Sequence, residues 1–585
     1  MMEDRCCMVP KHSGRNVLPN SPLFSRLLRF ANRRPERIAI DDVRLNMQKT
    51  HLELLSDVLA LRERLLGTLT SATREALERR EEVYIAVLAP GGYEYAVAVL
   101  AILALGAAVV PLTPALPVEE AVYFIEKSRS VLVLASSSNM RKCRDLETRL
   151  ASRSNKSFQA VSIQPTTSCP TLYAGDVIIS SDRTLDENAP AVVIFTSGTT
   201  GPPKGAVMRR SFIFDCALEV ADHYQLTEDD VALHVLPVHH ATGVGINFFP
   251  SLVAGSRIEF RSGGFDEAKM WERWKQGASD NKRRLTVFSG VPTIYMRMRR
   301  YYQQRISKLP ADEIAKYVAG ARQFRACLCG TSALPQPLDD FWKHLMQKPI
   351  LQRYGATEFG AIFKMRLGDE SVPEGSVGEL ASGVDVKLSE GDEGEVLVKS
   401  PHMFSKYLRD PEGTAKAHDR DGYFRSGDIA RREGKYYFII GRASLDIIKS
   451  GGYKISALDV ERELLSLPYV AEAMVVGVPD EEYGQRVAAL VSLQNEVTPS
   501  ASLRNNDTFR HVLTIDDLRR DLRKRLAGYK LPTLLRIVDK ELPKTITGKV
   551  QKQILGPRFF PANYRERPEV QTWVARSSER ALAKL

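Results

Sequence analysis

A short glycine- and hydroxyl-rich run, TSGTTGPPKG at residues 196–205, constrains the fold of this 585-residue chain more than any other stretch. It follows an apolar segment, residues 191–195, whose length and composition predict a buried β-strand. The run contains four hydroxyl side chains, three glycines and Lys204. Glycines let backbone N–H groups approach a polyphosphate, hydroxyls donate hydrogen bonds to its oxygens, and a lysine supplies positive charge. The sequence therefore predicts a strand followed by a phosphate-binding loop.

This loop differs from the phosphate loop of the GxxxxGK[ST] kind. Pro203 stands where that motif requires its second glycine, and Gly205 follows Lys204 where the motif requires serine or threonine. A glycine- and threonine-rich surface turn without a ligand is the alternative, and the order of the residues disfavours it. We therefore expect a phosphate-binding loop of another family.

Composition and charge disfavour several other classes of protein. The net charge is +11, but acidic and basic residues alternate along the chain, so we expect no nucleic-acid partner. Seven cysteines without a paired CxxC arrangement predict neither a disulfide framework nor a zinc site. Glu3 and Asp4 near the start disfavour a secretory signal. Gly106 interrupts the apolar run at 96–112, which predicts a buried helix and a core strand rather than a transmembrane segment. We expect a soluble protein.

The chain alternates helical and strand-like patterns, which predicts an α/β protein. Residues 1–19 have the composition of a loose tail, and residues 37–40 are predicted to form the first strand. Residues 83–88 and 131–134 are apolar enough to be buried strands. The polar stretch at 152–170 is predicted to be a loop.

The phosphate-binding run resembles the nucleotide-binding signature of the AMP-forming adenylating enzymes, which include acyl-CoA synthetases, the adenylation domains of peptide synthetases and beetle luciferases. The resemblance covers nearly the whole chain and includes YGATE at 354–358 and LPKTITGK at 542–549. It implies an α/β fold in which a large multi-subdomain N-terminal domain and a small α+β C-terminal domain are joined by a hinge. The expected units are the tail (1–19), the N-terminal domain that binds ATP and the acyl group (20–441), a mobile C-terminal domain (442–555) and a C-terminal extension (556–585).

The resemblance also implies a site for ATP and Mg²⁺. Glu358 is expected to bind Mg²⁺, a hard cation that prefers oxygen ligands, and Thr357 to hold the α-phosphate. Asp428 is expected to accept both ribose hydroxyls, with Arg442 as its partner, while Tyr354 stacks on adenine. The residues expected to contact ATP or AMP are Thr196, Ser197, Gly198, Thr199, Thr200, Gly201, Lys204, Gly330, Thr331, Tyr354, Gly355, Ala356, Thr357, Asp428 and Arg442.

By the same resemblance, the reaction has two steps at one site. The substrate carboxylate attacks ATP to give an acyl-adenylate and pyrophosphate, and the CoA thiol then attacks the acyl group after the C-terminal domain has rotated. Lys549 is expected to act as an electrostatic clamp on the reacting carboxylate, and the pivot is expected within residues 443–446. The expected catalytic residues are Lys549, Thr357, Glu358 and His240, and the expected CoA and hinge residues are Ser444, Lys449, Gly451 and Gly452.

The finer details are similar to the malonyl- and methylmalonyl-CoA synthetase branch of acyl-CoA synthetases. His240 is expected at the mouth of the acyl pocket, although adjacent histidines also occur as satisfied core pairs. Arg297 is expected either to bind a distal carboxylate or to be an exposed helix arginine. Thr242 replaces a second histidine of that branch, and small side chains at other pocket positions predict an acid larger than malonate, either a substituted dicarboxylate or a medium-chain fatty acid. The expected acyl pocket consists of His240, Ala241, Thr242, Tyr295, Arg297 and Ala356.

Alternatives to this enzyme are a luciferase-like adenylate-forming oxidoreductase, malonyl-CoA synthetase itself, and an inactive binding protein on the same fold. The presence of Glu358, Asp428 and Lys549 disfavours the inactive protein. The terminal Ala-Lys-Leu resembles the peroxisomal Ser-Lys-Leu address, which implies a peroxisomal import receptor as partner. The expected compartment is therefore the peroxisome, with the cytoplasm or the mitochondrion as alternatives. A pocket with relaxed selectivity would suit a role in secondary metabolism or in fatty acid metabolism.

Overall fold

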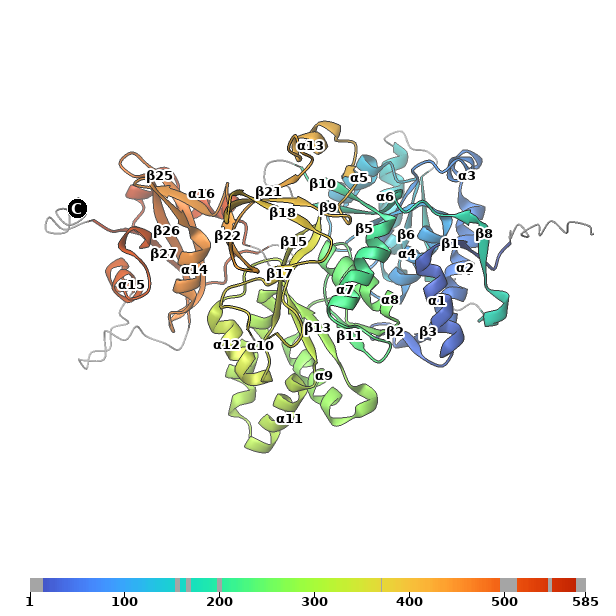
Figure 1. Ribbon diagram of the computed structural model, residues 1–585, viewed down its shortest axis with the longest axis horizontal. Helices are drawn as coiled ribbons and strands as arrows, with labels where there is room; N and C mark the ends of the chain where they lie inside the picture. The colour runs from blue at the N-terminus through green and yellow to red at the C-terminus, as the bar shows by residue number, and fades with distance from the viewer. Residues whose placement is uncertain are drawn as a thin grey trace, which may run out of the picture.

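The computed structural model describes residues 14–152, 158–164, 170–196, 202–369, 371–494, 513–544 and 550–574. Two large sheets with helices on their faces form most of the molecule, and a smaller sheet lies at one end, next to β22 (Figure 1). This arrangement follows from the alternation of helical and strand-like segments along the chain.

The first sheet has the strand order β20-β10-β9-β5-β4-β6-β7. Strands β9, β5, β4, β6 and β7 run parallel, and β10 pairs antiparallel with β9 and β20. Its strands are β20 (Lys406–Tyr407), β10 (Lys204–Arg209), β9 (Pro190–Thr196), β5 (Ala108–Leu112), β4 (Tyr84–Leu88), β6 (Leu132–Ala135) and β7 (Gln159–Ser162). The helices of this part are α1 (Pro22–Arg33), α2 (His51–Thr68), α3 (Ser71–Glu78), α4 (Tyr93–Leu105), α5 (Val118–Ser128) and α6 (Met140–Ser152).

Helix α4 is apolar on every side, and each of its residues is buried. Gly106 ends the helix in the left-handed conformation at φ 85°, which glycine adopts without a steric penalty, and β5 follows. The predicted buried helix and core strand are thus confirmed. None of the helices that the structure describes is long and apolar enough to cross a membrane.

The second sheet joins a parallel half to an antiparallel half, in the order β18-β19-β21-β22-β17-β16-β15-β14-β13-β11-β12-β2-β3. Its strands are β18 (Asp385–Glu390), β19 (Glu393–Lys399), β21 (Phe424–Glu433), β22 (Tyr436–Arg442), β17 (Glu379–Leu380), β16 (Gly360–Lys364), β15 (Leu351–Ala356), β14 (Ala326–Cys329), β13 (Val287–Gly290), β11 (Val231–His234), β12 (Arg257–Phe260), β2 (Ile38–Asp42) and β3 (Met47–Thr50). Its helices are the π-helices η4 (Phe212–Cys216) and η5 (Gly243–Phe248), with α7 (Ala217–His223), α8 (Phe249–Ala254), α9 (Glu267–Ser279), α10 (Pro292–Gln304), α11 (Ala311–Arg322) and α12 (Gln336–Met346).

The C-terminal sheet has the order β24-β23-β26-β27-β28, and β25 also pairs with β26. Its elements are β23 (Ile447–Ser450), β24 (Tyr453–Ser456), α14 (Ala457–Leu465), β25 (Val470–Asp480), β26 (Gly484–Leu493), α15 (Ile515–Leu522), β27 (Leu534–Val538), α16 (Lys552–Phe559) and β28 (Val570–Thr572).

Three predicted boundaries differ from the structure. Part of the predicted tail forms β1 (Val17–Asn20), which pairs parallel with β8 (Ile178–Thr184), because Leu18 is buried in the main core. The first strand is therefore β1, and the one predicted at 37–40 is β2. The predicted loop at 152–170 contains β7. Much of the predicted C-terminal extension belongs to the C-terminal unit, since β28 pairs antiparallel with β27.

Candidate active site

The phosphate-binding run begins and ends on paired strands. Thr196 is the last residue of β9 and lies opposite Lys204, the first residue of β10. The Thr196 hydroxyl donates to the Lys204 carbonyl at 3.3 Å. Lys204 Nζ lies 3.5 Å from Asp410 Oδ2. The predicted phosphate contacts at positions Ser197, Gly198, Thr199, Thr200 and Gly201 lie outside the described residues.

The YGATE segment lies at the tight turn from β15 to β16. Gly355 packs so closely against Gly360 that a Cβ atom there would lie 2.0 Å from the Gly360 carbonyl oxygen, so only glycine fits. Ala356 is partly exposed, and Thr357 is buried. Oε1 of Glu358 accepts a 2.8 Å hydrogen bond from the Tyr407 hydroxyl. The turn therefore holds the Glu358 carboxylate beside Tyr407. Tyr407 lies on β20, which pairs with β10, the strand that begins at Lys204.

The predicted ribose-binding residues meet across two consecutive antiparallel strands. Asp428 on β21 lies opposite Arg442 on β22, whose Nε donates to Oδ1 at 2.9 Å. The Tyr354 hydroxyl donates to the other carboxylate oxygen at 2.7 Å. Burial and the Asp428 charge raise the pKa of Tyr354 well above its usual value, so this hydroxyl stays a donor. The Asp428 carboxylate is thus fixed by two donors.

The loop after β14 is strained. Thr331 has φ +75°, a conformation that a β-branched residue rarely adopts and that often accompanies a functional site. The preceding Gly330 leaves room for the side chain of Arg353. A Cβ atom at position 330 would lie only 3.0 Å from Arg353 Cγ, which is a tight contact. Among the described residues, Oγ of Ser289 and Oγ1 of Thr331 are buried without hydrogen-bond partners.

The sequence analysis missed Arg353. It lies on β15 immediately before Tyr354 and is only 6% exposed. Within the part of the chain that the structure describes, neither of its Nη atoms has a hydrogen-bond partner. Burial lowers its pKa, and the phenol of Tyr224 is one of the groups that face it. The sequence signal was a basic residue inside an otherwise buried strand, LQRYGA.

The predicted acyl segment lies between β11 and η5. His240, Ala241 and Thr242 are partly exposed there. Gly243 has to be glycine, because a Cβ atom would lie 2.1 Å from the Pro237 carbonyl oxygen. Burial, together with the neighbouring His240, lowers the pKa of His239 to about 4, so this ring is neutral near pH 7.

The two predicted pocket residues on α10 are already engaged. Tyr295 is fully buried, and its hydroxyl donates to the Leu328 carbonyl at 3.0 Å. Arg297 Nη2 forms a 2.6 Å ion pair with Glu267 and donates to the Phe265 carbonyl at 2.9 Å. The structure thus gives the Tyr295 hydroxyl and the Arg297 guanidinium protein partners. Their contacts with an acyl group stay predictions.

The last residue of the predicted pivot, Asp446, is held by contacts on both sides of it in the chain. Asp446 accepts from the Arg442 amide at 3.0 Å and from Lys552 Nζ at 2.6 Å, and Lys552 also pairs with the partly buried Glu461 at 2.7 Å. These contacts connect β22 to the C-terminal unit. The side chains of Ser444 and Lys449 are exposed, as are Gly451 and Gly452 at positive φ. Lys549 lies outside the described residues.

Two family models match this chain. The model described as AMP-binding enzyme matches residues 27–408, and that described as AMP-binding enzyme C-terminal domain matches residues 459–549. The chain belongs to the AMP-binding enzyme family. Lys204, Glu358 and Tyr407 lie within the first match, whereas Asp428 and Arg442 lie between the two matches.

Relatives of this AMP-binding enzyme match it over nearly its whole length. Acyl-CoA ligase oryP of Aspergillus oryzae is 34% identical over 554 residues, 93% of each chain. The mitochondrial malonate–CoA ligase ACSF3 of Mus musculus is 32% identical over 602 residues, 96% of each chain. The crystal structure of ATP-bound MatB from Rhodopseudomonas palustris has 25% identity and a TM-score of 0.75, over 94% of this chain and 100% of MatB. A malonyl-CoA ligase complex with methylmalonyl-CoA and AMP has 28% identity and a TM-score of 0.56, over 87% of this chain and 97% of that ligase.

These matches confirm the predicted family, branch and fold class. They also confirm the enzyme class, an acid–thiol ligase that is an AMP-forming acyl-CoA synthetase using ATP, Mg²⁺ and CoA.

Proposed function

We propose that this AMP-binding enzyme converts a dicarboxylic acid larger than malonate, a substituted dicarboxylate, into its CoA thioester. The observation that carries this proposal is the buried guanidinium of Arg353, whose two Nη atoms have no hydrogen-bond partner among the described residues. An unpaired buried charge is costly unless a ligand pairs with it. A medium-chain monocarboxylic acid has no second anion for Arg353, so the dicarboxylate is favoured.

The position of Arg353 supports this choice. Its strand and the neighbouring β13 and β14 are parallel and end at the same edge of the sheet, where open α/β sheets bind ligands. The unpartnered hydroxyls of Ser289 and Thr331 come from the ends of β13 and β14. Ala241 and Ala356 are small and partly exposed, which leaves volume for a substituent. Several relatives are named malonate–CoA ligases, which agrees with a dicarboxylate.

We assign the first step to the described site as follows. The substrate carboxylate attacks the α-phosphorus of ATP, a new O–P bond forms, and the bond to the bridging oxygen breaks so that pyrophosphate leaves. Asp428 would accept both ribose hydroxyls, and Thr357 would hold the α-phosphate. Lys549 would bridge the substrate carboxylate and the phosphate oxygens. The β- and γ-phosphates would be held by Thr196, Ser197, Thr199, Thr200 and Lys204.

Glu358 is the side chain that would hold Mg²⁺, which supplies charge neutralisation on the phosphates when bound. In the described ranges, no group of three or more His, Cys, Asp or Glu side chains could hold a metal ion by itself. This fits Mg²⁺, which proteins commonly bind through one or two carboxylates together with substrate phosphates and water.

In the second step the CoA sulfur bonds to the acyl carbon, the bond from that carbon to the AMP oxygen breaks, and the thiol proton is released. We propose that the C-terminal domain begins after Arg442 and rotates about residues 443–446, which moves Lys549 away and brings Gly451 and Gly452 to the CoA channel. The anchoring of Asp446 to Lys552 supports a pivot just before Asp446.

The experiment that tests the function measures AMP and pyrophosphate release by the purified protein. ATP, Mg²⁺ and CoA are supplied with malonate, methylmalonate, longer dicarboxylates or medium-chain fatty acids, and Lys549→Ala is the control. We expect CoA-dependent turnover to be highest with a substituted dicarboxylate. Higher turnover with fatty acids would contradict the proposal of a dicarboxylic substrate. AMP release that does not require CoA would favour the luciferase-like alternative.

We also propose a peroxisomal address at Ala583-Lys584-Leu585, outside the described residues. Relatives named as mitochondrial make the mitochondrion the competing compartment. A fluorescent protein fused to the N-terminus is expected to colocalise with a peroxisomal marker and to become diffuse when the last three residues are deleted. Because an N-terminal fusion can mask a mitochondrial leader, a C-terminal fusion is the control, and its mitochondrial signal would contradict the proposal.

A further inference from the structure

Residues 404–410 connect the two segments proposed to hold the phosphates and Mg²⁺. The Phe404 amide donates to the Glu358 carbonyl at 2.8 Å. Two residues of β20 then pair antiparallel with β10, and the Leu408 amide donates to the Gly205 carbonyl at 2.7 Å. This segment, which we call the bridging segment, therefore fixes the backbone after Thr357 relative to the backbone after Lys204.

Two side chains of the bridging segment contact the same two motifs. The Tyr407 hydroxyl donates to Glu358 Oε1 at 2.8 Å, and Lys204 Nζ lies 4.9 Å from the centroid of the Tyr407 ring. Asp410 Oδ2 lies 3.5 Å from Lys204 Nζ, while its Oδ1 accepts from the Gly413 amide at 2.8 Å, at the start of α13 (Pro411–Lys416). Tyr407 thus contacts both the lysine and the carboxylate.

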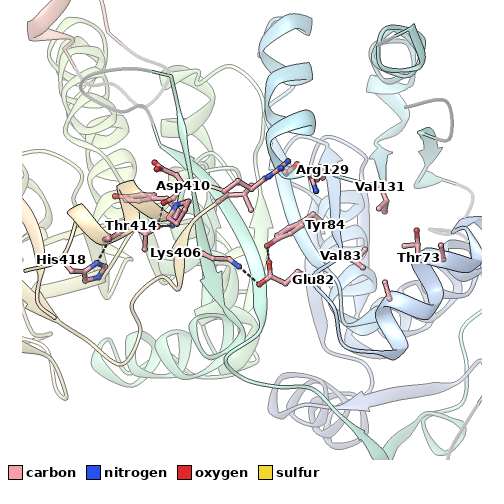
Figure 2. Close-up of a pocket in the computed structure, with 18 residues that line it drawn as sticks. Thr73, Glu82, Val83, Tyr84, Arg129, Val131, Lys406, Asp410, Thr414 and His418 are labelled. Atoms are coloured by element: carbon pink, nitrogen blue, oxygen red, sulfur yellow. Dashed lines mark hydrogen bonds and ion pairs between the residues drawn. The ribbon is translucent and has the colours of Figure 1, made fainter. Parts of the chain in front are cut away.

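A cavity of about 840 Å³ lies along the bridging segment, and Tyr407 and Asp410 are among its lining residues. Figure 2 shows Lys406 in this cavity, paired with Glu82, which lies just before β4, while Asp410 and Thr414 lie further along. The Tyr407 ring is packed beside this cavity: Tyr407 is 8% exposed, belongs to the main hydrophobic core, and its ring centroid lies 4.8 Å from that of Phe404. The packed ring therefore holds the Tyr407 hydroxyl within hydrogen-bond distance of Glu358.

We propose that Tyr407 is a positioning residue for metal–nucleotide binding: its hydroxyl orients the Glu358 carboxylate, and its ring supports Lys204. This inference rests on the roles proposed above for Glu358 and Lys204. The hydrogen bond uses one lone pair of Oε1 and sets the plane of the carboxylate, so that Oε2 keeps a defined direction. Metal-binding carboxylates need such partners, and their loss typically weakens metal binding 10- to 100-fold.

The chemistry of Tyr407 suits this role. A tyrosine hydroxyl has an ordinary pKa of about 10, so it is protonated near pH 7 and donates its hydrogen bond to Glu358 Oε1. The ring can attract the Lys204 ammonium through its π-face without donating or accepting a proton.

The decisive variant is Tyr407→Phe, which removes the hydroxyl and keeps the ring beside Lys204. Calorimetric titration with the non-hydrolysable α,β-methylene analogue of ATP is carried out with Mg²⁺ and again with EDTA. We expect the affinity for the Mg²⁺ complex to fall about 10- to 100-fold, while the affinity for the metal-free analogue stays within about twofold of wild type. In turnover, KM for MgATP is expected to rise more than kcat falls.

Lys406→Ala is the matched control, since Lys406 is the adjacent residue and its ion pair with Glu82 points away from Glu358. This variant is expected to bind both forms of the analogue like wild type. Equal loss of both affinities in Tyr407→Phe would show a general effect on folding and would overturn the proposal, as would unchanged binding. The titration needs no acid substrate, so a failure of the dicarboxylate proposal leaves its outcome interpretable.

Discussion

Replacing Arg353 with methionine is expected to lower kcat/KM for dicarboxylic acids about 10- to 100-fold and to leave kcat/KM for monocarboxylic acids nearly unchanged. A hydrogen bond to a charged group contributes about 1.5–3 kcal/mol, which corresponds to this range. Methionine matches much of the length of the arginine stem and has no charge. The selectivity ratio between a dicarboxylate and a monocarboxylate of equal chain length is the quantity to measure.

The same substitution also tests whether Arg353 has only a structural role. Because the two Nη atoms of Arg353 have no hydrogen-bond partner in the described part of the chain, removing this buried charge is expected to leave the melting temperature unchanged or to raise it. Arg297→Met is the matched control, because the Arg297 guanidinium is already held by Glu267 and the Phe265 carbonyl. A lower melting temperature with equal losses for both classes of acid would contradict a role in substrate recognition.

Replacing Asp428 with alanine is expected to lower kcat/KM for ATP about 100-fold, mainly through KM. The variant loses the carboxylate that we propose accepts both ribose hydroxyls, and two hydrogen bonds to a charged group together contribute several kcal/mol. It also leaves Tyr354 and Arg442 without the carboxylate between them. Steady-state kinetics with ATP and with 2′-deoxyATP measure this effect.

The comparison of the two nucleotides identifies the cause of the loss. Wild type is expected to prefer ATP over 2′-deoxyATP, and Asp428→Ala is expected to lose this preference because the hydroxyl then has no acceptor. Asp385→Ala serves as control, since Asp385 lies on β18, which β19 separates from β21, and accepts from Tyr423. If the variant kept the full preference for ATP, another residue would bind the 2′-hydroxyl.

The sequence by itself determined the family and predicted a nucleotide site whose individual contacts stay predictions. The motifs place particular residue types at strand ends, and strand ends can be predicted from local apolar patterns. Asp428 and Arg442 were predicted as partners and lie across from each other on β21 and β22. The buried helix α4 was predicted because its apolar run ends at Gly106, where local conformational preference and burial agree.

Only the tertiary structure decided which polar side chains are already paired. Arg297 and Tyr295 have the residue types of a polar pocket, yet Glu267 and the Leu328 carbonyl engage them. Arg353 is an arginine in an apolar strand, and the surroundings in which its two Nη atoms find no hydrogen-bond partner among the described residues come from other segments, including Tyr224 just after α7. Tyr407 reaches Glu358 only because β20 pairs with β10. Pairing and burial arise from contacts between distant segments, and local sequence patterns do not contain them.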